Sequence, residues 1–501
     1  MLIKYNCLQW APLAWVARCS INEKAVSVWH GRQVETRDEW FCEAAWPGTF
    51  STGGFDQTDL MAGTGGHCRD NVLTFVAPGN TVDRILSLRT AEGLLVSNSL
   101  SCLLAVSGAA IDPTFPRYYE DFTTIIHGLS AYKRTLATSL GDIRITMFGL
   151  LTWDGREATE RTHEIVRRDF SSFTRYERFL QDNLTALAQN IADPARRQRY
   201  RLLATASSGY DSPAISVLAR KAGCEEALCI DKDRFGEMEN GDRVAAHLGL
   251  RPIHVAREAW RKLDDAELSF IAADGTAEAV SLASAGANLA GSVLLTGYHG
   301  DKVWAKYAKD LSEDVVRGDS SGLSLTEYRL WAGFIHCPIT FWGIRQIRDI
   351  NRLSNSKEML PWDIPGDYSR PIPRRIVESA GVPREAFGMV KRASAVAFTE
   401  FLSPSSLETY RAWLTQNRSE WLKRGKLPPP TNEGYERLAS GILAMIESAL
   451  HKIPLLWRLA PQNSLDRPSR LRRYAFAWAA GAVSRRYLRQ IDDRAGLPPD
   501  F

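Results

Sequence analysis

The sequence lacks a regular cysteine pattern, a long apolar run and a strong excess of either charge. Its eight cysteines form no CxxC pair and no even spacing, so disulfides and structural zinc are not expected, whereas a reducing, cytoplasmic compartment is. The longest weakly polar stretch, 474–483, is about half of the ~20 apolar residues that a membrane-spanning helix needs. The amino terminus has no secretory signal, which predicts no export.

Charge and composition narrow the class further. Lys and Arg number 62 against 58 Asp and Glu, a net charge of +4 that argues against nucleic acid as the main partner. With 45% hydrophobic and 24% charged residues over 501 positions, a globular chain of two or three domains is expected. An arginine-rich segment near the carboxy terminus is typical of a packing helix with snorkelling arginines, and contact with a membrane surface is the alternative. Its arginines are Arg467, Arg470, Arg472, Arg473, Arg485, Arg486 and Arg489.

The first part of the chain, to about residue 150, alternates short apolar and polar positions between turns rich in Gly, Pro, Asn and Asp, as at 25–29, 72–76 and 93–97. This pattern predicts a mostly antiparallel, β-rich unit with few helices. From about residue 172 the period changes, and apolar residues recur at helical intervals over 176–191. The change indicates the start of a second domain.

Strand and helix patterns then alternate, which indicates a parallel sheet with helices on both faces. In such sheets ligands bind beyond the carboxyl ends of the strands, so the residues after Ala206, Ile230 and Leu295 are where a site is expected. From about residue 325 the pattern is mostly helical, with an extended proline-rich connector at 427–430. The expected strands are 202–206, 227–230, 252–255 and 293–295, and the expected helices are 213–222, 238–248 and 277–290.

A turn of small residues, 207–212 (SSGYDS), follows the first of these strands and precedes a helix. Gly209 can take positive φ, Ser212 is placed to cap, and Pro213 suits a first helical turn. Exposed amides and the helix dipole would then form an anion site. Asp211 makes sense there as a ligand of Mg²⁺ that phosphates also bind. The alternative is a common strand-to-helix connector with a good cap.

This turn resembles the signature of the ATP-pyrophosphatase (PP-loop) superfamily, Ser-Gly-Gly-x-Asp-Ser. Ser207, Gly209, Asp211 and Ser212 match it, whereas Ser208 stands at the first Gly. That departure requires a backbone without positive φ, or some strain. The resemblance implies that Ser207, Gly209 and Ser212 hold the phosphates of ATP. The sequence has no Walker A pattern, which disfavours a kinase or GTPase loop.

A second loop, 296–302 (TGYHGDK), follows the last of these strands. It resembles the Gly-Glu-Gly-x-Asp-Glu loop of asparagine synthetases and, more closely, the Thr-Gly-Tyr-Gly-x-Asp loop of β-lactam synthetases. The resemblance implies that Gly297 and Gly300 shape a nucleotide-binding loop and that Asp301 holds Mg²⁺ and pyrophosphate together with Asp211. Two carboxylates at one sheet edge could chelate the same ion. By itself, the Gly-x-x-Gly-Asp pattern is only a turn.

Tyr298 stands where asparagine synthetases have Glu and β-lactam synthetases have a Tyr that works with a separate glutamate to deprotonate an amine. Glu327 lies at a similar remove, so the resemblance implies a proton relay between Tyr298 and Glu327. The alternative, favoured for Glu327, is that Tyr298 packs and that Glu327 pairs with Arg329 or caps a helix. A third resemblance covers 371–392, where Lys391 matches the lysine that contacts phosphoryl groups during adenylation.

Two further segments resemble the same relatives. Residues 239–249 are similar to a segment that helps close the nucleotide pocket, and Ile230 and Asp231 would flank the adenine or ribose. Residues 94–128 resemble the glutaminase domain of asparagine synthetases, but position 2 is Leu instead of the catalytic Cys. The resemblance therefore implies a degenerate domain without glutaminase activity. The amine would come from ammonia, an unidentified donor or the substrate itself.

The patterns and resemblances together predict an α+β, β-rich degenerate class II glutamine amidotransferase-like domain at 1–165. An α/β parallel-sheet ATP-pyrophosphatase domain at 172–425 and a helical extension at 426–501 are expected to follow. The expected activity is ATP- and Mg²⁺-dependent amide formation through an acyl-adenylate, from a small-molecule or peptide carboxylate and an amine. An asparagine synthetase that uses ammonia and an intramolecular cyclase of the β-lactam or lasso-peptide kind are the alternatives. A catalytically silent scaffold is a third, because several loop residues depart from the family pattern. These are Ser208, His299 and Lys302.

Overall fold

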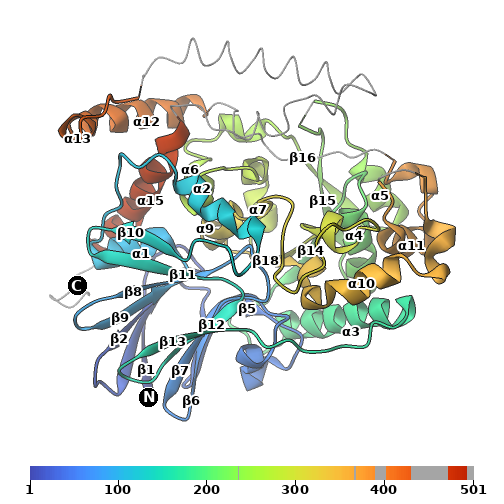
Figure 1. The fold of residues 1–501 in the computed structure, drawn as a ribbon, viewed down its shortest axis with the longest axis horizontal. Coiled ribbons are helices and arrows are strands. Elements are labelled where there is room, and N and C mark those ends of the chain that lie inside the picture. Colours follow the sequence, from blue (N-terminus) through green and yellow to red (C-terminus); the bar gives the residue numbers. More distant parts are fainter. Residues whose placement is uncertain (235, 366–367, 390–401, 430–471, 493–501) are drawn as a thin grey trace.

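The amino-terminal part of the chain forms two β-sheets that pack face to face (Figure 1). The computed structural model describes residues 1–234, 236–365, 368–389, 402–429 and 472–492. In spatial order, the seven-stranded sheet contains β1 (Leu2–Cys7), β3 (Ala25–His30), β2 (Trp15–Ser20), β9 (Gly93–Ser97), β8 (Ile85–Arg89), β11 (Gly141–Thr146) and β10 (Thr135–Thr138). The six-stranded sheet contains β13 (Ala158–Thr162), β12 (Gly149–Trp153), β7 (Val72–Val76), β6 (Ala62–Arg69), β5 (Trp40–Ala45) and β4 (Glu35–Thr36).

Apolar residues from both sheets form the core of this sandwich. Trp15 of β2 stacks on Phe75 of β7 with ring centroids 6.0 Å apart, and Phe41 of β5 meets Trp15 edge-on at 5.0 Å. The strand pairs are antiparallel except for β1 with β3. The predicted β-rich unit with few helices is confirmed. It contains the short helices α1 (Leu100–Ser107) and α2 (Tyr118–Thr123).

The middle of the chain forms a five-stranded parallel sheet. Its spatial order is β16 (Arg251–Val255), β15 (Glu226–Ile230), β14 (Arg201–Thr205), β17 (Ser292–Thr296) and β18 (Ile335–Pro338). The chain runs outward from β14 to β16 and then returns to the other side of β14 as β17. Loops leaving β14 and β17 therefore diverge at their carboxyl ends, and such a switch point is where open parallel sheets bind ligands.

Helices connect and cover this sheet (Figure 1). The α-helices that follow the sandwich are α3 (Phe173–Ala192), α4 (Asp211–Lys221), α5 (Gly241–His247), α6 (Leu268–Asp274), α7 (Gly286–Leu289), α8 (Gly300–Val303), α9 (Leu325–Ala332), α10 (Ile347–Ser354), α11 (Pro371–Ser379), α12 (Pro404–Gln416), α13 (Arg418–Lys423) and α15 (Ala475–Asp492). The 3₁₀ turns are η1 (Phe50–Thr52), η2 (Gly54–Gln57), η3 (Thr124–His127), η4 (Ala259–Lys262), η5 (Val280–Ala285), η6 (Ile339–Phe341), η7 (Ile344–Gln346), η8 (Lys357–Trp362), η9 (Arg384–Ala386) and η11 (Arg472–Tyr474).

The structure corrects three of the sequence-based expectations for this part. The helix expected over 238–248 is only the short α5, and the helix expected over 277–290 is divided into η5 and α7. The fifth strand, β18, lies in a region expected to be mostly helical. Its four residues are too few to show a period, and only pairing with β17 makes them a strand.

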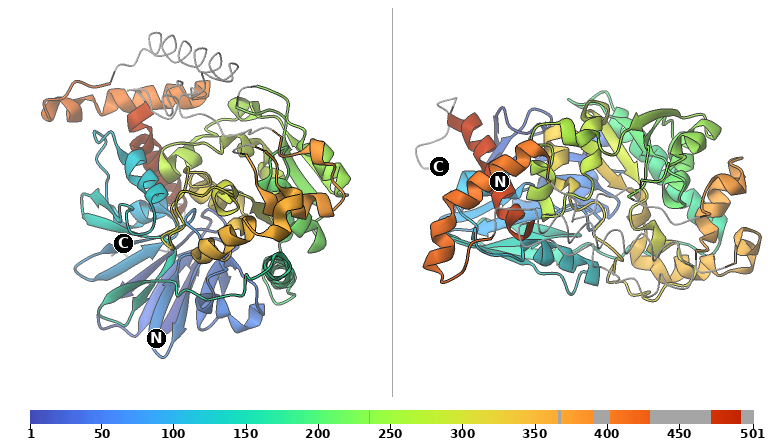
Figure 2. Two further views of the ribbon diagram at one scale, coloured as in Figure 1. Left: turned by 45° about the vertical axis from the view of Figure 1, so that its right-hand side comes forward. Right: turned by 90° about the horizontal axis from the view of Figure 1, so that it is seen from above.

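The last described helix, α15, returns to the sandwich. It packs against α6 and α1, and its end lies beside the orange helix α12 in both views of Figure 2. Its apolar face is buried at Phe476, Val483 and Tyr487. The apolar stretch 474–483 is therefore covered by the protein's own helices. Within the described residues, no helix combines the length and the apolar character needed to cross a membrane. Arg467, Arg470 and residue 430 of the proline-rich connector lie outside the described residues.

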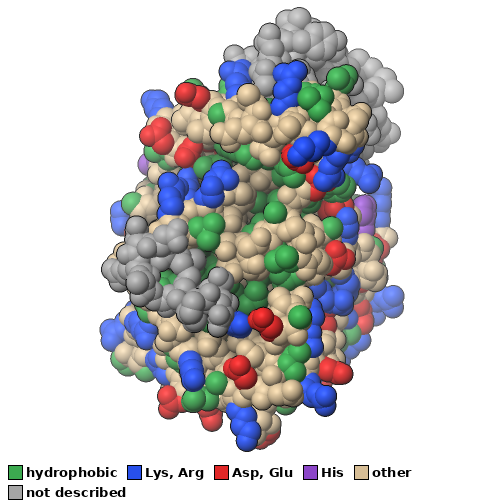
Figure 3. Space-filling view, turned by 90° about the vertical axis from the view of Figure 1, so that its left-hand side faces the viewer, with side chains coloured by type: hydrophobic (Ala, Val, Ile, Leu, Met, Phe, Trp, Pro, Cys, Tyr) green, Lys and Arg blue, Asp and Glu red, His purple; other side chains and the backbone are tan. Residues whose placement is uncertain are grey.

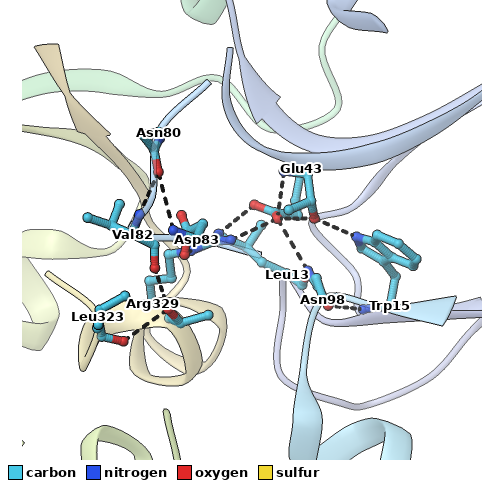
Figure 4. A network of polar contacts seen from close by, with 11 residues as sticks. Leu13, Trp15, Glu43, Asn80, Val82, Asp83, Asn98, Leu323 and Arg329 are labelled. Atoms are coloured by element: carbon cyan, nitrogen blue, oxygen red, sulfur yellow. Dashed lines mark hydrogen bonds and ion pairs between the residues drawn. The ribbon is translucent and has the colours of Figure 1, made fainter. Parts of the chain in front are cut away.

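A buried ion-pair network joins the sandwich to the helices around the parallel sheet (Figure 4). Arg329 on α9 donates two hydrogen bonds to Glu43 of β5, at 2.6 and 3.0 Å, and a third to Asp83 at 2.9 Å. Asn98 also donates to Glu43, at 3.2 Å. Because the side chains of Arg329 and Glu43 are fully buried, these contacts fix the sandwich relative to α9.

Candidate functional site

A cavity of about 270 Å³ opens at the carboxyl ends of β14, β15 and β17. It lies at the switch point of the parallel sheet, where the sequence analysis expects a site. One wall consists of the turn 206–212 and the loop 296–301. A second wall consists of residues at and just before η5 and of the segment before α9. The two motifs and a second set of polar residues therefore face one space.

The turn after β14 is held by hydroxyl contacts. Ser207 Oγ lies 2.6 Å from Ser212 Oγ and accepts the backbone N–H of Gly209 at 3.2 Å. Helix α4 begins at Asp211, two residues before Pro213, so Ser212 lies in its first turn instead of capping it. Gly209 does not take positive φ, which corrects that expectation also. The first turn of α4 faces the cavity and supplies the positive end of a helix dipole.

Ser208 fits the position where the family signature has glycine. Its backbone does not take positive φ, so no strain arises there. Its N–H donates to Glu239 at 2.9 Å, and its hydroxyl lies 2.9 Å from the same carboxylate. Its carbonyl accepts the N–H of Gly388 at 2.8 Å. The serine thus anchors the turn on two sides.

The loop after β17 lies directly against Asp211. A Cβ atom on Gly297 would lie 2.7 Å from the backbone carbonyl carbon of Asp211, and one on Gly300 would lie 2.6 Å from its Oδ1. Only glycine permits this approach. Asp301 follows in α8 and lines the same cavity as Asp211. Burial, followed by Asp211 and more weakly Asp301, raises the pKa of Tyr368, so both carboxylates act on one phenol.

His299 occupies a backbone conformation that favours glycine. Its φ is 72°, and its ring stacks on Phe341 with centroids 5.2 Å apart. The side chain is 4% exposed and lines the cavity, and its Nε2 has no hydrogen-bond partner among the described residues. Burial, together with Arg317, lowers its pKa to about 3. His299 is therefore neutral at ordinary pH.

The second wall contains two carboxyl groups that no sequence motif indicated. Glu278 Oε1 accepts the N–H of Gly322 at 2.5 Å, and burial, followed by the charges of Asp319 and Asp274, raises the pKa of Glu278 to about 8. Burial also opposes ionisation of Asp319, but Arg317 and hydrogen bonds from Ser321 outweigh it and lower the Asp319 pKa. No motif marks either residue, because each lies in an irregular segment.

Tyr298 lines the cavity beside this wall. Burial raises its pKa, and the charges of Glu278 and Asp319 raise it further. Glu327 does not line the cavity. Its carboxylate accepts hydrogen bonds from Ser99 at 2.6 Å, Trp331 at 2.9 Å and Tyr487 at 3.0 Å. The structure thus gives Glu327 neither Tyr298 nor Arg329 as a partner, and Glu278 takes its place as the carboxylate near Tyr298.

Of the remaining predicted site residues, some line the cavity and others lie outside it. Ile230 lines the cavity, but Asp231 does not, since its carboxylate accepts the N–H of Arg257 at 2.9 Å. Gly300 lies behind Asp211, outside the cavity lining. The side chain of Lys302 lies against Gly318. Lys391 lies outside the described residues.

The donor set suits Mg²⁺ bound together with phosphates. In the described part of the chain, no group of three or more His, Cys, Asp or Glu side chains could enclose a metal. Mg²⁺ is usually bound by one or two carboxylates plus substrate oxygens, and Asp211 with Asp301 supplies two. The helix end and serine hydroxyls beside them suit phosphate oxygens.

Comparison with known proteins adds no assignment: no family model matches the chain, and no curated protein matches it. The geometry of the cavity therefore carries the functional argument.

Proposed function

We propose that the protein is an ATP-dependent carbon–nitrogen ligase similar to asparagine synthetases, which activates a carboxylate as an acyl-adenylate and joins it to an amine. The observation that carries this proposal is the approach of the Gly297–Gly300 loop to Asp211, with Asp301 beside it in one cavity. On this proposal the parallel-sheet part is an ATP-pyrophosphatase domain. The sandwich is a degenerate glutaminase-type domain.

The proposed reaction has two steps. An oxygen of the substrate carboxylate attacks the α-phosphorus of ATP, the bond from that phosphorus to the bridging oxygen breaks, and pyrophosphate leaves with the electron pair. The amine nitrogen then attacks the acyl carbon, AMP leaves with the electrons of the C–O bond, and the amine loses a proton. The product is an amide.

Residues of both walls have roles in this scheme. Ser207, the N–H groups at the start of α4 and Ser212 bind phosphate oxygens, and Asp211 with Asp301 holds Mg²⁺. Bound Mg²⁺ supplies charge neutralisation at the phosphates. Glu278 accepts the proton that the amine loses, and Tyr298, near Glu278, orients the amine. A general base with a pKa near the working pH is efficient, and the pKa of Glu278, about 8, meets this requirement.

The test is pyrophosphate exchange into ATP with a panel of carboxylic acids that includes aspartate, other amino acids and short peptides. We expect exchange with at least one acid, and a loss of about 100-fold or more in Asp211→Asn and Asp301→Asn, since each removes a charge at the transferring phosphate. Asp242→Asn is the matched control, because Asp242 lies in the first turn of α5 and does not line the cavity.

The outcomes separate the alternatives. Exchange that is absent with every acid contradicts the ligase and favours a silent scaffold. Release of asparagine from aspartate and ammonium salts identifies an ammonia-using asparagine synthetase. Exchange without asparagine release leaves a ligase for another acid and amine, including an intramolecular cyclase.

A further inference from the structure

The cavity lining contains five acidic side chains and, among the described lining residues, no Lys or Arg. The acidic residues are Asp211, Glu239, Glu278, Asp301 and Asp319. Under the proposed function, Asp211 and Asp301 belong to the phosphate side. Glu239 already accepts hydrogen bonds from the N–H and the hydroxyl of Ser208. Glu278 and Asp319 remain, in segments outside the phosphate-binding turn and near Tyr298.

Both side chains, when ionised, can still accept hydrogen bonds from a ligand. Glu278 uses Oε1 for the N–H of Gly322, and its Oε2 makes no hydrogen bond with any described residue. Asp319 accepts the N–H of Ser321 at 3.0 Å and lies 3.9 Å from Arg317 Nη2, with 51% of its side chain exposed. A bound cation would therefore meet at least one accessible oxygen on each.

A second observation independently indicates a polar ligand at this wall. Ser281 on η5 is 2% exposed and lines the cavity, and its hydroxyl makes no hydrogen bond with any described residue. Buried hydroxyls without a partner are rare in folded proteins. Two carboxylates and a hydroxyl provide three acceptors, which is the number of N–H donors on a primary ammonium group.

The same wall offers apolar surface beside these acceptors. Ala279 and Leu282 line the cavity on either side of Ser281. An alkyl group attached to the nitrogen would bury against them, whereas an ammonium ion has no apolar surface to bury. The composition of the wall therefore favours an organic ammonium over ammonia itself.

The segment that carries Asp319 is held in place by the amino-terminal part of the chain. Leu129 donates its N–H to the carbonyl of Asp314 at 2.7 Å, and Arg317 donates its N–H to the carbonyl of Ile126 at 2.9 Å. The buried guanidinium of Arg317 also donates to the carbonyl of Thr81 at 3.1 Å. These contacts fix the segment that carries Asp319 before any ligand binds, which lowers the entropic cost of binding.

We propose that Glu278, Ser281 and Asp319 form a subsite for an organic ammonium group, so that the amine substrate is a primary amine on a carbon skeleton. The inference rests on the proposed function only in naming this amine as the nucleophile. On this view the amino-terminal part of the chain, which has Leu at position 2, contributes to the reaction by positioning Asp319 in the amine subsite.

The test is binding of n-butylammonium chloride to the full chain without nucleotide, measured by calorimetry at constant ionic strength and at pH 9, where Glu278 is ionised. Ammonium chloride and butan-1-ol are the comparison ligands. We expect butylammonium to bind at least tenfold more tightly than ammonium, and butan-1-ol not to bind. Glu278→Gln and Asp319→Asn should each weaken butylammonium binding at least tenfold, and Ser281→Ala severalfold. Glu239→Gln is the matched control and should bind as the wild type does, because Glu239 already accepts hydrogen bonds from Ser208.

Equal affinity for butylammonium and ammonium overturns the subsite, as does unchanged binding in both Glu278→Gln and Asp319→Asn. An equal loss in Glu239→Gln also overturns it, since that result would indicate nonspecific attraction to the cavity. Near-ultraviolet circular dichroism verifies that each variant is folded. The binding assay uses no nucleotide, so it tests the subsite independently of the ligase. If butylammonium binds but no acid supports pyrophosphate exchange, only the proposed ligase activity is contradicted. Exchange without butylammonium binding contradicts the subsite alone.

Discussion

At the scale of single residues, Glu278 and Asp319 are two acidic side chains of one cavity wall whose pKa values are shifted in opposite directions. Burial and neighbouring carboxylates raise the Glu278 pKa to about 8, whereas Arg317 and Ser321 outweigh burial and lower that of Asp319. Divergent pKa values of neighbouring groups are a common feature of sites that move protons. Glu278 is therefore the member of the pair that can exchange a proton near neutral pH.

This difference predicts a pH effect on stability. The groups that face Glu278 are Asp274, Asp319, Arg317 and Tyr298. In the unfolded chain Glu278 loses its proton near 4.5, and in the folded chain near 8. Between these pH values the folded state holds the additional proton, so the free energy of unfolding falls as pH rises.

Glu278→Gln removes this dependence. Relative to that variant, the wild type should lose about 4 kcal/mol of stability between about pH 5 and pH 9. Urea unfolding at both pH values measures the difference. Asp142→Asn, at an exposed position on β11, should keep the dependence of the wild type. Parallel pH curves for Glu278→Gln and the wild type would contradict the raised pKa.

At the scale of secondary-structure elements, the site depends on how closely the loop after β17 approaches the start of α4. Gly297 is the position where this approach leaves no room for a side chain. The expected role of Gly209 was conformational, yet its φ is not positive, and a Cβ there would lie 3.4 Å from Ser207 Oγ. Gly297 therefore leaves no room for a side chain, whereas Gly209 has room for a methyl group.

Gly297→Ala should destabilise the fold by about 1–3 kcal/mol, because the added methyl group meets backbone atoms that cannot move independently. Gly209→Ala should change the free energy of unfolding by less than about 0.5 kcal/mol, since its nearest neighbour is at ordinary contact distance. Thermal or urea unfolding of both variants measures the contrast. Equal effects would show that the loop does not press on α4 as described.

At the scale of the whole molecule, buried polar contacts join the sandwich to the parallel-sheet part. Arg329 pairs with Glu43 and Asp83, and Glu327 holds Ser99 of the sandwich and Tyr487 of α15 together. On the surface, by contrast, charges of both signs are interspersed over the face in Figure 3. The buried contacts of Arg329 and Glu327 thus set the geometry between the two parts.

Arg329→Met should destabilise the protein by about 3–5 kcal/mol, because it leaves the carboxylates of Glu43 and Asp83 buried without their cation. Arg18→Met is the control. It breaks a pair with Glu92, whose side chain is 75% exposed, and should cost no more than about 1 kcal/mol. Denaturant unfolding followed by tryptophan fluorescence compares them. A loss in Arg329→Met no larger than in Arg18→Met would contradict the joining role of the network.

Features that depend on neighbours along the chain could be predicted from the amino-acid sequence. The alternation of strand and helix patterns predicted β14, α4, β15 and β17, and the small-residue motifs indicated the turns that follow β14 and β17. These predictions succeeded because period, glycine content and strand ends are local properties. The prediction that Ser212 caps α4 was wrong, because the exact residue at which a helix begins does not follow from the local pattern.

Only the tertiary structure decided which residues complete the site. Glu278 and Asp319 come from irregular segments about forty residues apart in sequence, and contacts with the amino-terminal part of the chain place the latter. Glu327 has the spacing of a proton-relay partner, but α9 directs it to Ser99 and Tyr487 instead. Sequence spacing cannot distinguish these cases, because the direction of a side chain depends on how distant elements pack.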